Sequence, residues 1–361
     1  MERYLEIADR FQLDGRAVSA VSHGGGHIND TFLIKTTAGE KYYILQRINT
    51  SVFKNAEALM ENIILVTDFL REKIAKAGGD PERETMNVVL TKDGRTLYRD
   101  EEGCWRVYMF IDGTMTMQTC ENAEQFYLSA CAFGHFQKLL ADFPADRLYE
   151  SIPNFHNTKS RYLDFEAAVE RDVCGRAASV AEEIAFVRGH REFAATLVDM
   201  QERGELPLRV THNDTKLNNV LFDEKTGKPL AVVDLDTVMP GLSVNDFGDS
   251  IRFGATYAAE DEPDLSKVNF EIELFDCYTK GFLGECGSLL SENEKRMLPV
   301  GAMMMTFECG MRFLTDHLNG DTYFKIHREN QNLDRCRTQF KLVRDMEEAR
   351  ELMRKTVEKY S

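Results

Sequence analysis

The chain has 361 residues, which is enough for one large domain or two medium ones with a substantial buried core. Its hydrophobic share of 43% and its charged share of 29% are ordinary for a globular protein and exclude a mainly disordered chain. Acidic residues outnumber basic ones by 60 to 44 without any block rich in Lys or Arg, so a nucleic acid or an anionic membrane is an unfavourable partner.

Two further features concern the cellular location. No apolar run is long enough to span a bilayer, and the first residues, MERYLEIADRFQLDG, lack the basic and apolar segments of a signal peptide. The eight cysteines are scattered without a CxxC pair, which favours free thiols in a reducing compartment over disulfides or zinc. We therefore expect a cytoplasmic protein, without nucleic-acid or membrane partners, that is a monomer or a weak homodimer.

Residues 1–112 are predicted to form mainly an antiparallel β-sheet. Six short segments have strand character: RAVSAVSHGGG, NDTFLIKT, KYYILQRI, MNVVLTKDG, RTLYRD and CWRVYMFI. One long helix interrupts them at residues 55–79, where Gly78 and Gly79 close the end. Apolar residues recur there at helical spacing: Leu59, Ile63, Val66, Leu70 and Ile74.

The pattern becomes helical after Asp112-Gly113, where we expect a tight hinge. The long amphipathic segments cover about residues 121–141, 160–202, 267–284, 291–318 and 328–358. They surround a short strand-rich insert at residues 210–241. The sequence therefore predicts an N-lobe of residues 1–112 and a mainly helical C-lobe of residues 113–361.

The insert, VTHNDTKLNNVLFDEKTGKPLAVVDLDTVMPG, gathers short polar side chains at the ends of apolar runs. His212, Asp214 and Asn219 have the spacing H-x-D-x-x-x-x-N. In phosphoryl-transfer enzymes of the protein-kinase type, this aspartate accepts the proton of the attacking hydroxyl and this asparagine binds magnesium. The motif alone is weak, so the surrounding strands must support it.

That context is favourable, because Asn219 runs directly into one short apolar strand and a second one ends in Asp234. Mg²⁺ prefers oxygen ligands, taken from one or two side chains and from nucleotide phosphates. We interpret Asp214 as the catalytic base and Asn219 and Asp234 as metal ligands. The alternative, that these residues are turn formers, explains Asn218 and Asp223 but not the kinase-like order of the others.

Three other residues of the insert have less certain roles. His212 is expected to organise the loop rather than take part in the chemistry. Lys216 could meet the transferring phosphoryl group, or it could be a solvated surface lysine. Asp236 could be a supporting neighbour of Asp234 or an alternative metal ligand, and the sequence leaves both open.

A glycine-rich turn in SHGGGHINDTFLI, between two predicted strands, is the candidate phosphate-covering loop. Gly24, Gly25 and Gly26 allow the backbone to approach a phosphate closely. The G-x-G-x-x-G spacing is absent, so a plain β-hairpin turn is the alternative.

The strand YYILQRI supplies the candidate basic residue for the nucleotide phosphates. Its alternation places Arg47 on one face with Tyr43 and Leu45. Glu61 or Glu57 on the following helix could be the partner of Arg47, with Glu61 slightly favoured. A plain surface charge is the alternative for each of them.

The order of these features resembles the aminoglycoside phosphotransferase and choline kinase family, and the resemblance covers nearly the whole chain. More narrowly, six segments resemble the N-acetylhexosamine 1-kinases, which transfer the ATP γ-phosphate to the anomeric hydroxyl of GlcNAc or GalNAc. These segments are GGGHINDTF, YILQRIN, LMENI, THNDTKLNNVLF, VVDLDTVMPGLSVNDFGDSIRFGA and ECGMRFLTDHLNGDTYFK.

The resemblance implies an α+β, bilobal protein-kinase-like fold, with a small antiparallel N-lobe containing one long helix and a larger helical C-lobe. It implies Mg²⁺ as cofactor, ATP as co-substrate and a small-molecule sugar as substrate, with Asp214, Asn219 and Asp234 in the roles given above. It also implies that Asp246 braces the catalytic loop. Arg47 stands where much of the wider family has lysine, and its forked head changes the expected contact geometry.

Five residues are candidates for the sugar site: His27, Asn29, Phe253, Arg312 and Tyr323. They offer directional hydrogen-bonding groups and an apolar platform for a sugar ring. Phe253 could instead be a core residue, and Arg312 could be an ion-pair partner of Glu308 or Asp316. An amino alcohol, aminoglycoside or homoserine kinase of the same fold is the first alternative function, and a non-catalytic binding protein is the second.

Overall fold

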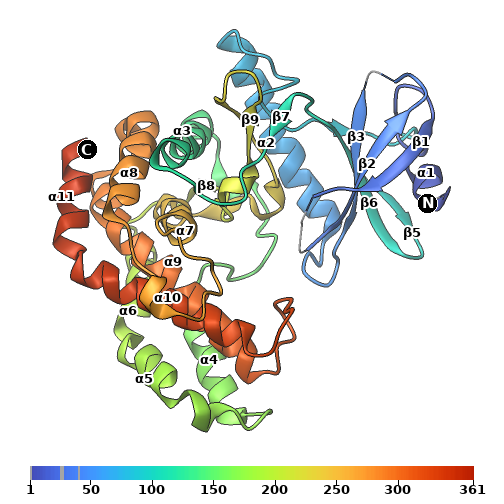
Figure 1. The fold of residues 1–361 in the computed structure, drawn as a ribbon. Coiled ribbons are helices and arrows are strands. Elements are labelled where there is room, and N and C mark those ends of the chain that lie inside the picture. Colours follow the sequence, from blue (N-terminus) through green and yellow to red (C-terminus); the bar gives the residue numbers. More distant parts are fainter. Residues whose placement is uncertain (1, 25–27, 40) are drawn as a thin grey trace. The chain divides into compact units, whose positions relative to one another are not determined.

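The structure is a computed structural model that describes residues 2–24, 28–39 and 41–361 (Figure 1). The chain divides into two compact units. The first contains Met1–Thr116, Asp142–Pro153 and Val220–Met239, and the second contains Met117–Ala141, Asn154–Asn219 and Pro240–Ser361. The first unit thus takes in two segments that lie well beyond residue 112 in the sequence.

A six-stranded antiparallel sheet forms the main part of the first unit. Its order is β1-β2-β3-β6-β4, and β5 pairs with the first residues of β6. The strands are β1 (Ala17–Ser22), β2 (Asp30–Thr36), β3 (Tyr42–Ile48), β4 (Val88–Val89), β5 (Tyr98–Asp100) and β6 (Gly103–Met109). All six predicted strand segments are therefore confirmed.

The two faces of this sheet are covered by different helices (Figure 1). The short helix α1 (Glu2–Ala8) packs with Tyr43, Leu45 and Val107 in one apolar core. Side chains alternate along a strand, so Arg106 points to the opposite face, where its Nη1 lies 3.8 Å from Met60 Sδ on α2. The helix α1 was not predicted, because seven residues with only two of them buried leave too short a periodic pattern.

The predicted long helix of the first unit is confirmed as α2 (Ala56–Lys76). Asn55 caps its start and accepts a hydrogen bond from the backbone N–H of Ala58 at 3.0 Å. Gly78 ends the helix with a left-handed φ of 82°, a conformation that favours glycine. All five apolar residues of the predicted helical spacing are buried.

The predicted strand-rich insert also forms as expected. β9 (Val220–Asp223) and β10 (Pro229–Val232) make an antiparallel hairpin, and β7 (Thr114–Met115) pairs with the other edge of β9. A short helical turn, η4 (Leu235–Thr237), follows the hairpin. Two further short strands, β8 (Arg209–Thr211) and β11 (Met239–Gly241), pair with each other.

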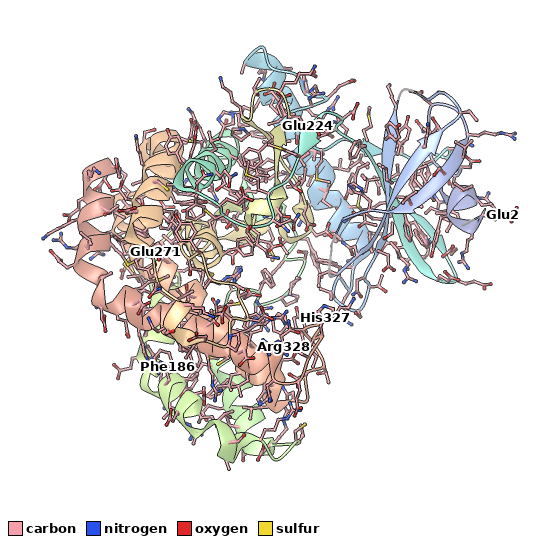
Figure 2. All side chains as sticks on the ribbon, viewed as in Figure 1. Glu2, Phe186, Glu224, Glu271, His327 and Arg328 are labelled. Carbon is pink, nitrogen blue, oxygen red and sulfur yellow. The ribbon has the colours of Figure 1, made fainter. Side chains whose placement is uncertain are left out.

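The second unit is mainly helical, which confirms the predicted α+β class. Its helices are α3 (Ala123–Leu139), α4 (Thr158–Arg171), α5 (Ala181–Gly189), α6 (Arg191–Glu202), α7 (Ser243–Gly254), α8 (Ile272–Cys286), α9 (Glu292–Leu318), α10 (Gln331–Glu348) and α11 (Arg350–Tyr360). Figure 2 shows Phe186 on α5, where its ring packs against Phe307 of α9 and Phe340 of α10.

Two predicted helical segments are divided, and one helix was missed. Residues 160–202 form three helices, with one break after α4, where Asp172 adopts a left-handed φ of 36°, and another at His190 between α5 and α6. Residues 328–358 form α10 and α11, which meet at Ala349. The helix α7 was missed; it is short, and eleven of its twelve residues are buried, including polar ones such as Asp246 and Asp249.

Five further 3₁₀ turns connect these elements. Three of them are η1 (Ala145–Arg147), η2 (Ala177–Val180) and η3 (Leu217–Asn219). The other two flank α8 and are η5 (Leu265–Lys267) and η6 (Gly287–Leu289). The turn η3 contains Asn219 and leads directly into β9.

Glycines allow α7 and α9 to approach each other backbone to backbone. A Cβ atom placed on Gly248 of α7 would lie 2.2 Å from the carbonyl oxygen of Gly301, and a Cβ on Gly301 would lie 2.2 Å from the carbonyl oxygen of Val244. No side chain fits at either position without displacing backbone. This crossing fixes α7, which carries Asp246 and Asp249, against α9.

We predict that Gly301→Ala lowers the free energy of unfolding by about 1–3 kcal/mol, because the added methyl group overpacks this crossing. Gly284→Ala on α8 is the matched control, since a Cβ there meets no atom of the described residues within 4 Å. In the control, alanine should raise the free energy of unfolding by about 0.5 kcal/mol through its better helix propensity. Urea titration measures both variants, and equal stability of the two would contradict the close approach.

Candidate functional site

A buried carboxylate holds the loop that follows β8. Asp246, in the first turn of α7, accepts hydrogen bonds from the backbone N–H groups of His212 at 2.9 Å and Asn213 at 2.7 Å. Gln137 of α3 donates a third bond at 2.6 Å. Burial raises the pKa of Asp246, and His212 and these hydrogen bonds oppose that rise. The bracing contact that the family resemblance implied for Asp246 is thus present.

A second carboxylate holds the loop one residue after Asp214. Asp249, one turn further along α7, accepts the backbone N–H of Thr215 at 2.9 Å and the Nε–H of Arg252 at 2.9 Å. Burial would raise the pKa of Asp249, but the charge and hydrogen bond of Arg252 outweigh it and lower the pKa. The backbone on both sides of Asp214 is therefore anchored to the same helix.

The structure brings Asp214, Lys216 and Asn219 together. Asn219 donates through Nδ2 to the backbone oxygen of Asp214 at 2.8 Å and to its Oδ2 at 3.2 Å. Lys216 Nζ lies 3.0 Å from Asp214 Oδ1, and the Asp214 carboxylate raises the pKa of Lys216. The side chain of Asp214 is 25% exposed, so it remains accessible to a small molecule. The loop thus presents a carboxylate, an ammonium group and an amide side by side.

Two histidines support this loop from within the second unit. His212 is fully buried, and its ring meets Phe133 and Phe136 edge to face, which fits the organising role predicted for it. His156 was not predicted, but its Nε2–H donates to the backbone oxygen of Asn213 at 3.1 Å. Its Nδ1 lies 2.9 Å from the buried Glu308 carboxylate on α9. Burial would lower the pKa of His156, but Glu308 outweighs it and the pKa is raised.

In the first unit, Asp234 and Asp236 differ sharply in environment. Asp234 is exposed and adopts a left-handed φ of 61° just before η4. Asp236 is only 4% exposed. The Oγ–H of Ser151 donates to the backbone oxygen of Asp236 at 3.0 Å, and Asn62 Nδ2 on α2 donates to the backbone oxygen of Val238 at 3.0 Å. The segment that carries Asp234 is therefore fixed from several sides.

The carboxylate of Asp236 forms an ion pair with Arg106, whose side chain is 1% exposed. Arg106 Nη2 donates to Asp236 Oδ2 at 2.9 Å, and its Nη1 lies 2.6 Å from Oδ1 in a contact without hydrogen-bond alignment. Burial alone would lower the pKa of Arg106, but Asp236 and its other acidic neighbours raise it above the ordinary value.

The predicted phosphate-contacting residue Arg47 lies on the other face of the sheet. Its Nε donates to Asp30 Oδ2 at 2.8 Å, and its guanidinium lies 6.0 Å from the ring of Trp105. Neither predicted helix partner reaches it: Glu57 accepts a hydrogen bond from Arg99 at 2.6 Å, and Glu61 is exposed and forms no ion pair within the described residues. The phosphate role of Arg47 stays a prediction.

The glycine-rich turn is only partly described. Gly25, Gly26 and His27 lie outside the described residues. Gly24 has a left-handed φ of 73°, and none of the described residues has an atom within 4 Å of a Cβ position there. Asn29, just beyond the turn, uses both ends of its side chain, because Nδ2 donates to Asp236 Oδ2 at 2.7 Å and Oδ1 accepts the backbone N–H of Asn49 at 2.9 Å.

Two of the predicted sugar contacts lie together in the second unit. The guanidinium of Arg312 lies 5.6, 5.8 and 5.4 Å from the rings of Phe155, Tyr323 and Phe324. Arg312 forms no ion pair with the described residues, so the alternative pairing with Glu308 or Asp316 is wrong. Glu308 is engaged by His156 and Thr158, and Asp316 accepts three backbone N–H groups, those of residues 322–324.

Phe253, the remaining sugar candidate, is half-buried at the end of α7. The cation that lies against its ring is Arg252, whose guanidinium is 6.0 Å away, rather than Arg312. Its part in a sugar site therefore stays a prediction.

Three supporting residues were missed by sequence reasoning, and their signals differ. Arg106 is the only charge in the apolar strand CWRVYMFI, a pattern that marks a buried and paired cation. Asn62 lies on the buried face of α2, beside Ile63. His156 gave no signal, because its partner Glu308 is 152 residues away along the chain.

Two structural features bear on cofactors and membranes. Within the described part of the chain, no group of three or more His, Cys, Asp and Glu side chains is arranged to hold a metal ion by itself. None of the helices there combines the length and the apolar character needed to cross a bilayer.

Several solved structures of small-molecule kinases are similar to this one. The aminoglycoside phosphotransferase of Alicyclobacillus acidocaldarius superposes with a TM-score of 0.64 at 13% identity, covering 98% of this chain and 95% of that one. A microcompartment-associated aminopropanol kinase gives 0.58 at 14% identity, covering 98% of both chains. The choline kinase of Cryptosporidium parvum gives 0.56 at 14% identity, covering 99% of this chain and 97% of that one.

These similarities confirm the protein-kinase-like α+β fold. The sequence pattern of the phosphotransferase enzyme family matches residues 19–272, which is more than two thirds of the chain. The matched range contains the braced loop, the hairpin that follows it and the segment of Asp234 and Asp236. The chain therefore belongs to the phosphotransferase enzyme family.

Proposed function

We propose that this chain is an ATP- and Mg²⁺-dependent kinase that phosphorylates the anomeric C1 hydroxyl of N-acetylhexosamines, giving the sugar 1-phosphate and ADP. The observation that carries the kinase part is the contact set of Asp214, Lys216 and Asn219 on one braced loop. A cytoplasmic location and a monomeric or weakly dimeric state belong to the same proposal.

Asp214 is the proposed base. Its carboxylate accepts the proton of the C1 hydroxyl as that oxygen forms a bond to the γ-phosphorus of ATP and the bond to the ADP oxygen breaks. Lys216, kept protonated by the neighbouring carboxylate, can contact the phosphoryl oxygens. Because Asp246 and Asp249 anchor the backbone around Asp214, the loop holds the base in place before substrate binds.

The donor set fits magnesium better than a metal held by protein alone. Magnesium takes one or two side-chain oxygens and completes its shell with phosphates and water, so the absence of a cluster of three acids or histidines within the described residues agrees with it. Asn219 and Asp234 are the proposed ligands, and the exposure of Asp234 lets an ion approach it from solvent. When bound, the ion would neutralise phosphate charge that this acidic chain otherwise repels.

The surroundings of Arg312 favour a neutral, oxygen-rich acceptor over a cationic one. Three aromatic rings surround its guanidinium, so the protein's own cation fills a position where a quaternary ammonium group would otherwise stack. The same guanidinium retains donors for hydroxyl or carbonyl oxygens, and Tyr323, 55% exposed, offers a ring face and a hydroxyl. These contacts support an N-acetylhexosamine acceptor over choline or an aminoglycoside.

We predict that Asp214→Asn loses about 10²- to 10⁴-fold in turnover while retaining its affinity for Mg-ATP, because the amide cannot accept the proton but keeps an oxygen for the hydrogen bond from Asn219. Asn219→Ala and Asp234→Asn should instead weaken Mg-ATP binding. A coupled ADP-release assay and calorimetry measure the two effects. Asn218→Ala is the matched control, since this neighbouring asparagine is assigned only to turn geometry. A near-normal rate in Asp214→Asn would remove this residue from the role of base.

The acceptor class is tested with an unmodified chain and a panel of GlcNAc, GalNAc, choline, ethanolamine and an aminoglycoside. We expect turnover with the two N-acetylhexosamines only, and phosphorus NMR should place the new phosphate on C1 rather than C6. Preferential turnover of a cationic acceptor would establish the alternative kinase function, and failure to bind Mg-ATP would support a non-catalytic binding protein.

We predict that Arg312→Met raises the KM for the acceptor about tenfold or more at an unchanged KM for ATP, because hydrogen bonds from a charged donor are lost. Arg344→Met is the matched control: that exposed arginine also stacks on a ring, 4.6 Å from Phe186, but lies outside the proposed site. Steady-state kinetics at saturating co-substrate measure both variants. An equal effect of the two variants would remove Arg312 from acceptor binding.

A further inference from the structure

The carboxylate of Asp236 connects three separate parts of the first unit. Its Oδ2 accepts one hydrogen bond from Arg106 on β6 and one from Asn29, the residue before β2. Asp236 also lies within η4, two residues after Asp234, which directly precedes that turn. One buried side chain therefore joins the sheet, the end of the glycine-rich turn and the segment of the proposed metal ligand.

Arg106 is itself held from the sheet side. Its Nε and Nη2 donate to Gln46 Oε1 at 3.0 and 2.8 Å, and Gln46 Nε2 donates to Thr31 Oγ1 at 3.0 Å. The guanidinium also lies 5.0 Å from the ring of Tyr108. Residues of β2, β3 and β6 thus hold the Arg106 guanidinium in place. The Asp236 carboxylate can therefore form its ion pair in only one position.

Asn29 links the Asp236 carboxylate to the residues at the start of β2 and the end of β3. Its Nδ2 donates to Asp236, and its Oδ1 accepts the N–H of Asn49 at the end of β3, so both ends of the amide are occupied. Asp30, the next residue, pairs with Arg47 at the start of the β2–β3 register. The chain leaving the glycine-rich turn is thus tied to Asp236 before it enters the sheet.

We propose that Asp236 is a positioning residue rather than a metal ligand: its buried carboxylate, neutralised by Arg106, holds Asn29 and so fixes the start of β2 relative to the segment of Asp234. This inference rests on the proposed function, because its effect on ATP depends on the phosphate-covering role predicted for the glycine-rich turn that precedes Asn29. It also gives Asn29 a role different from the sugar contact predicted from the sequence.

The alternative, in which Asp236 binds the metal, conflicts with its contacts. Both carboxylate oxygens lie against the Arg106 guanidinium, and the side chain is only 5% exposed. A divalent cation bound there would have to displace or face this fixed positive charge in a medium of low dielectric constant. Asp234, in the same segment, is instead exposed to solvent.

The first test is Asn29→Ala, a mild change that leaves the buried ion pair intact. We expect the affinity for ATP, measured by calorimetry with and without Mg²⁺, to fall about tenfold in both cases, because one hydrogen bond to a charged group is lost. The KM for the acceptor should stay within twofold. Asn55→Ala is the matched control, since it removes an asparagine cap of α2 and lowers stability without touching Asp236.

A raised acceptor KM with unchanged ATP affinity in Asn29→Ala would overturn the proposal and support the sugar contact. The second test is a double-mutant cycle with Asp236→Asn. If Asn29 acts through Asp236, the double variant should bind ATP no more weakly than Asp236→Asn alone. Fold-changes that multiply, or a loss in Asp236→Asn that is seen only with Mg²⁺ present, would assign Asp236 to the metal instead.

Hydrogen–deuterium exchange separates this inference from the proposed function. In the protein without nucleotide, Asn29→Ala should speed amide exchange at the start of β2, whereas Asn55→Ala should not. If the unmodified chain bound no Mg-ATP, both the function and the nucleotide role of the turn would be wrong. If it bound Mg-ATP and Asn29→Ala bound it equally well with unchanged exchange, only the positioning role would be wrong.

Discussion

The interaction on which the proposed catalytic loop depends is the set of hydrogen bonds to Asp246. A carboxylate removed from water loses several kcal/mol of hydration unless protein donors replace the water, and here the donors are the backbone of His212 and Asn213 and the side chain of Gln137. The loop cannot move away without leaving this buried group unsatisfied. Its conformation therefore follows from the position of α7, which the glycine crossing with α9 fixes in turn.

The first unit uses the same constraint with a different partner. Asp236 is also buried beside a short loop, but a guanidinium neutralises it, whereas neutral amide groups and the nearby His212 surround Asp246. A buried ion pair is weak evidence for stability, because desolvation offsets most of the attraction. The ion pair of Arg106 and Asp236 contributes geometry instead. Because the carboxylate is paired in only one position, the segments attached to it have one arrangement. That difference suits a segment that, under the proposed function, keeps Asp234 in place beside a polyanionic substrate.

Local patterns explain which parts of the structure could be predicted from the sequence. Alternation and turn residues identified the six strands, periodicity identified α2, and the spacing of His212, Asp214 and Asn219 correctly placed three groups on one loop. The break after α4 within residues 160–202 was missed, because a left-handed aspartate there resembles any other polar residue in an amphipathic pattern. The surroundings of Arg47 could not be predicted from the sequence for a different reason. Alternation grouped Arg47 with Tyr43 and Leu45, but it cannot tell which face of a strand packs against α1, and the charge facing Asp236 comes from β6 through a contact that spans 130 residues of sequence.

The position of Arg312 links the architecture of the second unit to acceptor chemistry. In a pocket built for a cationic acceptor, aromatic rings and acidic groups would both be free to meet the ligand. Here the rings of Phe155, Tyr323 and Phe324 surround an arginine, and the nearby Glu308 is already engaged by His156 and Thr158. In the proposed acceptor site, a cationic ligand would meet a fixed positive charge, whereas a carbonyl or hydroxyl oxygen would find a hydrogen-bond donor whose flat faces the rings shield from water. Under the proposed function, the arginine that fills this aromatic group would therefore select a neutral acceptor over a cationic one.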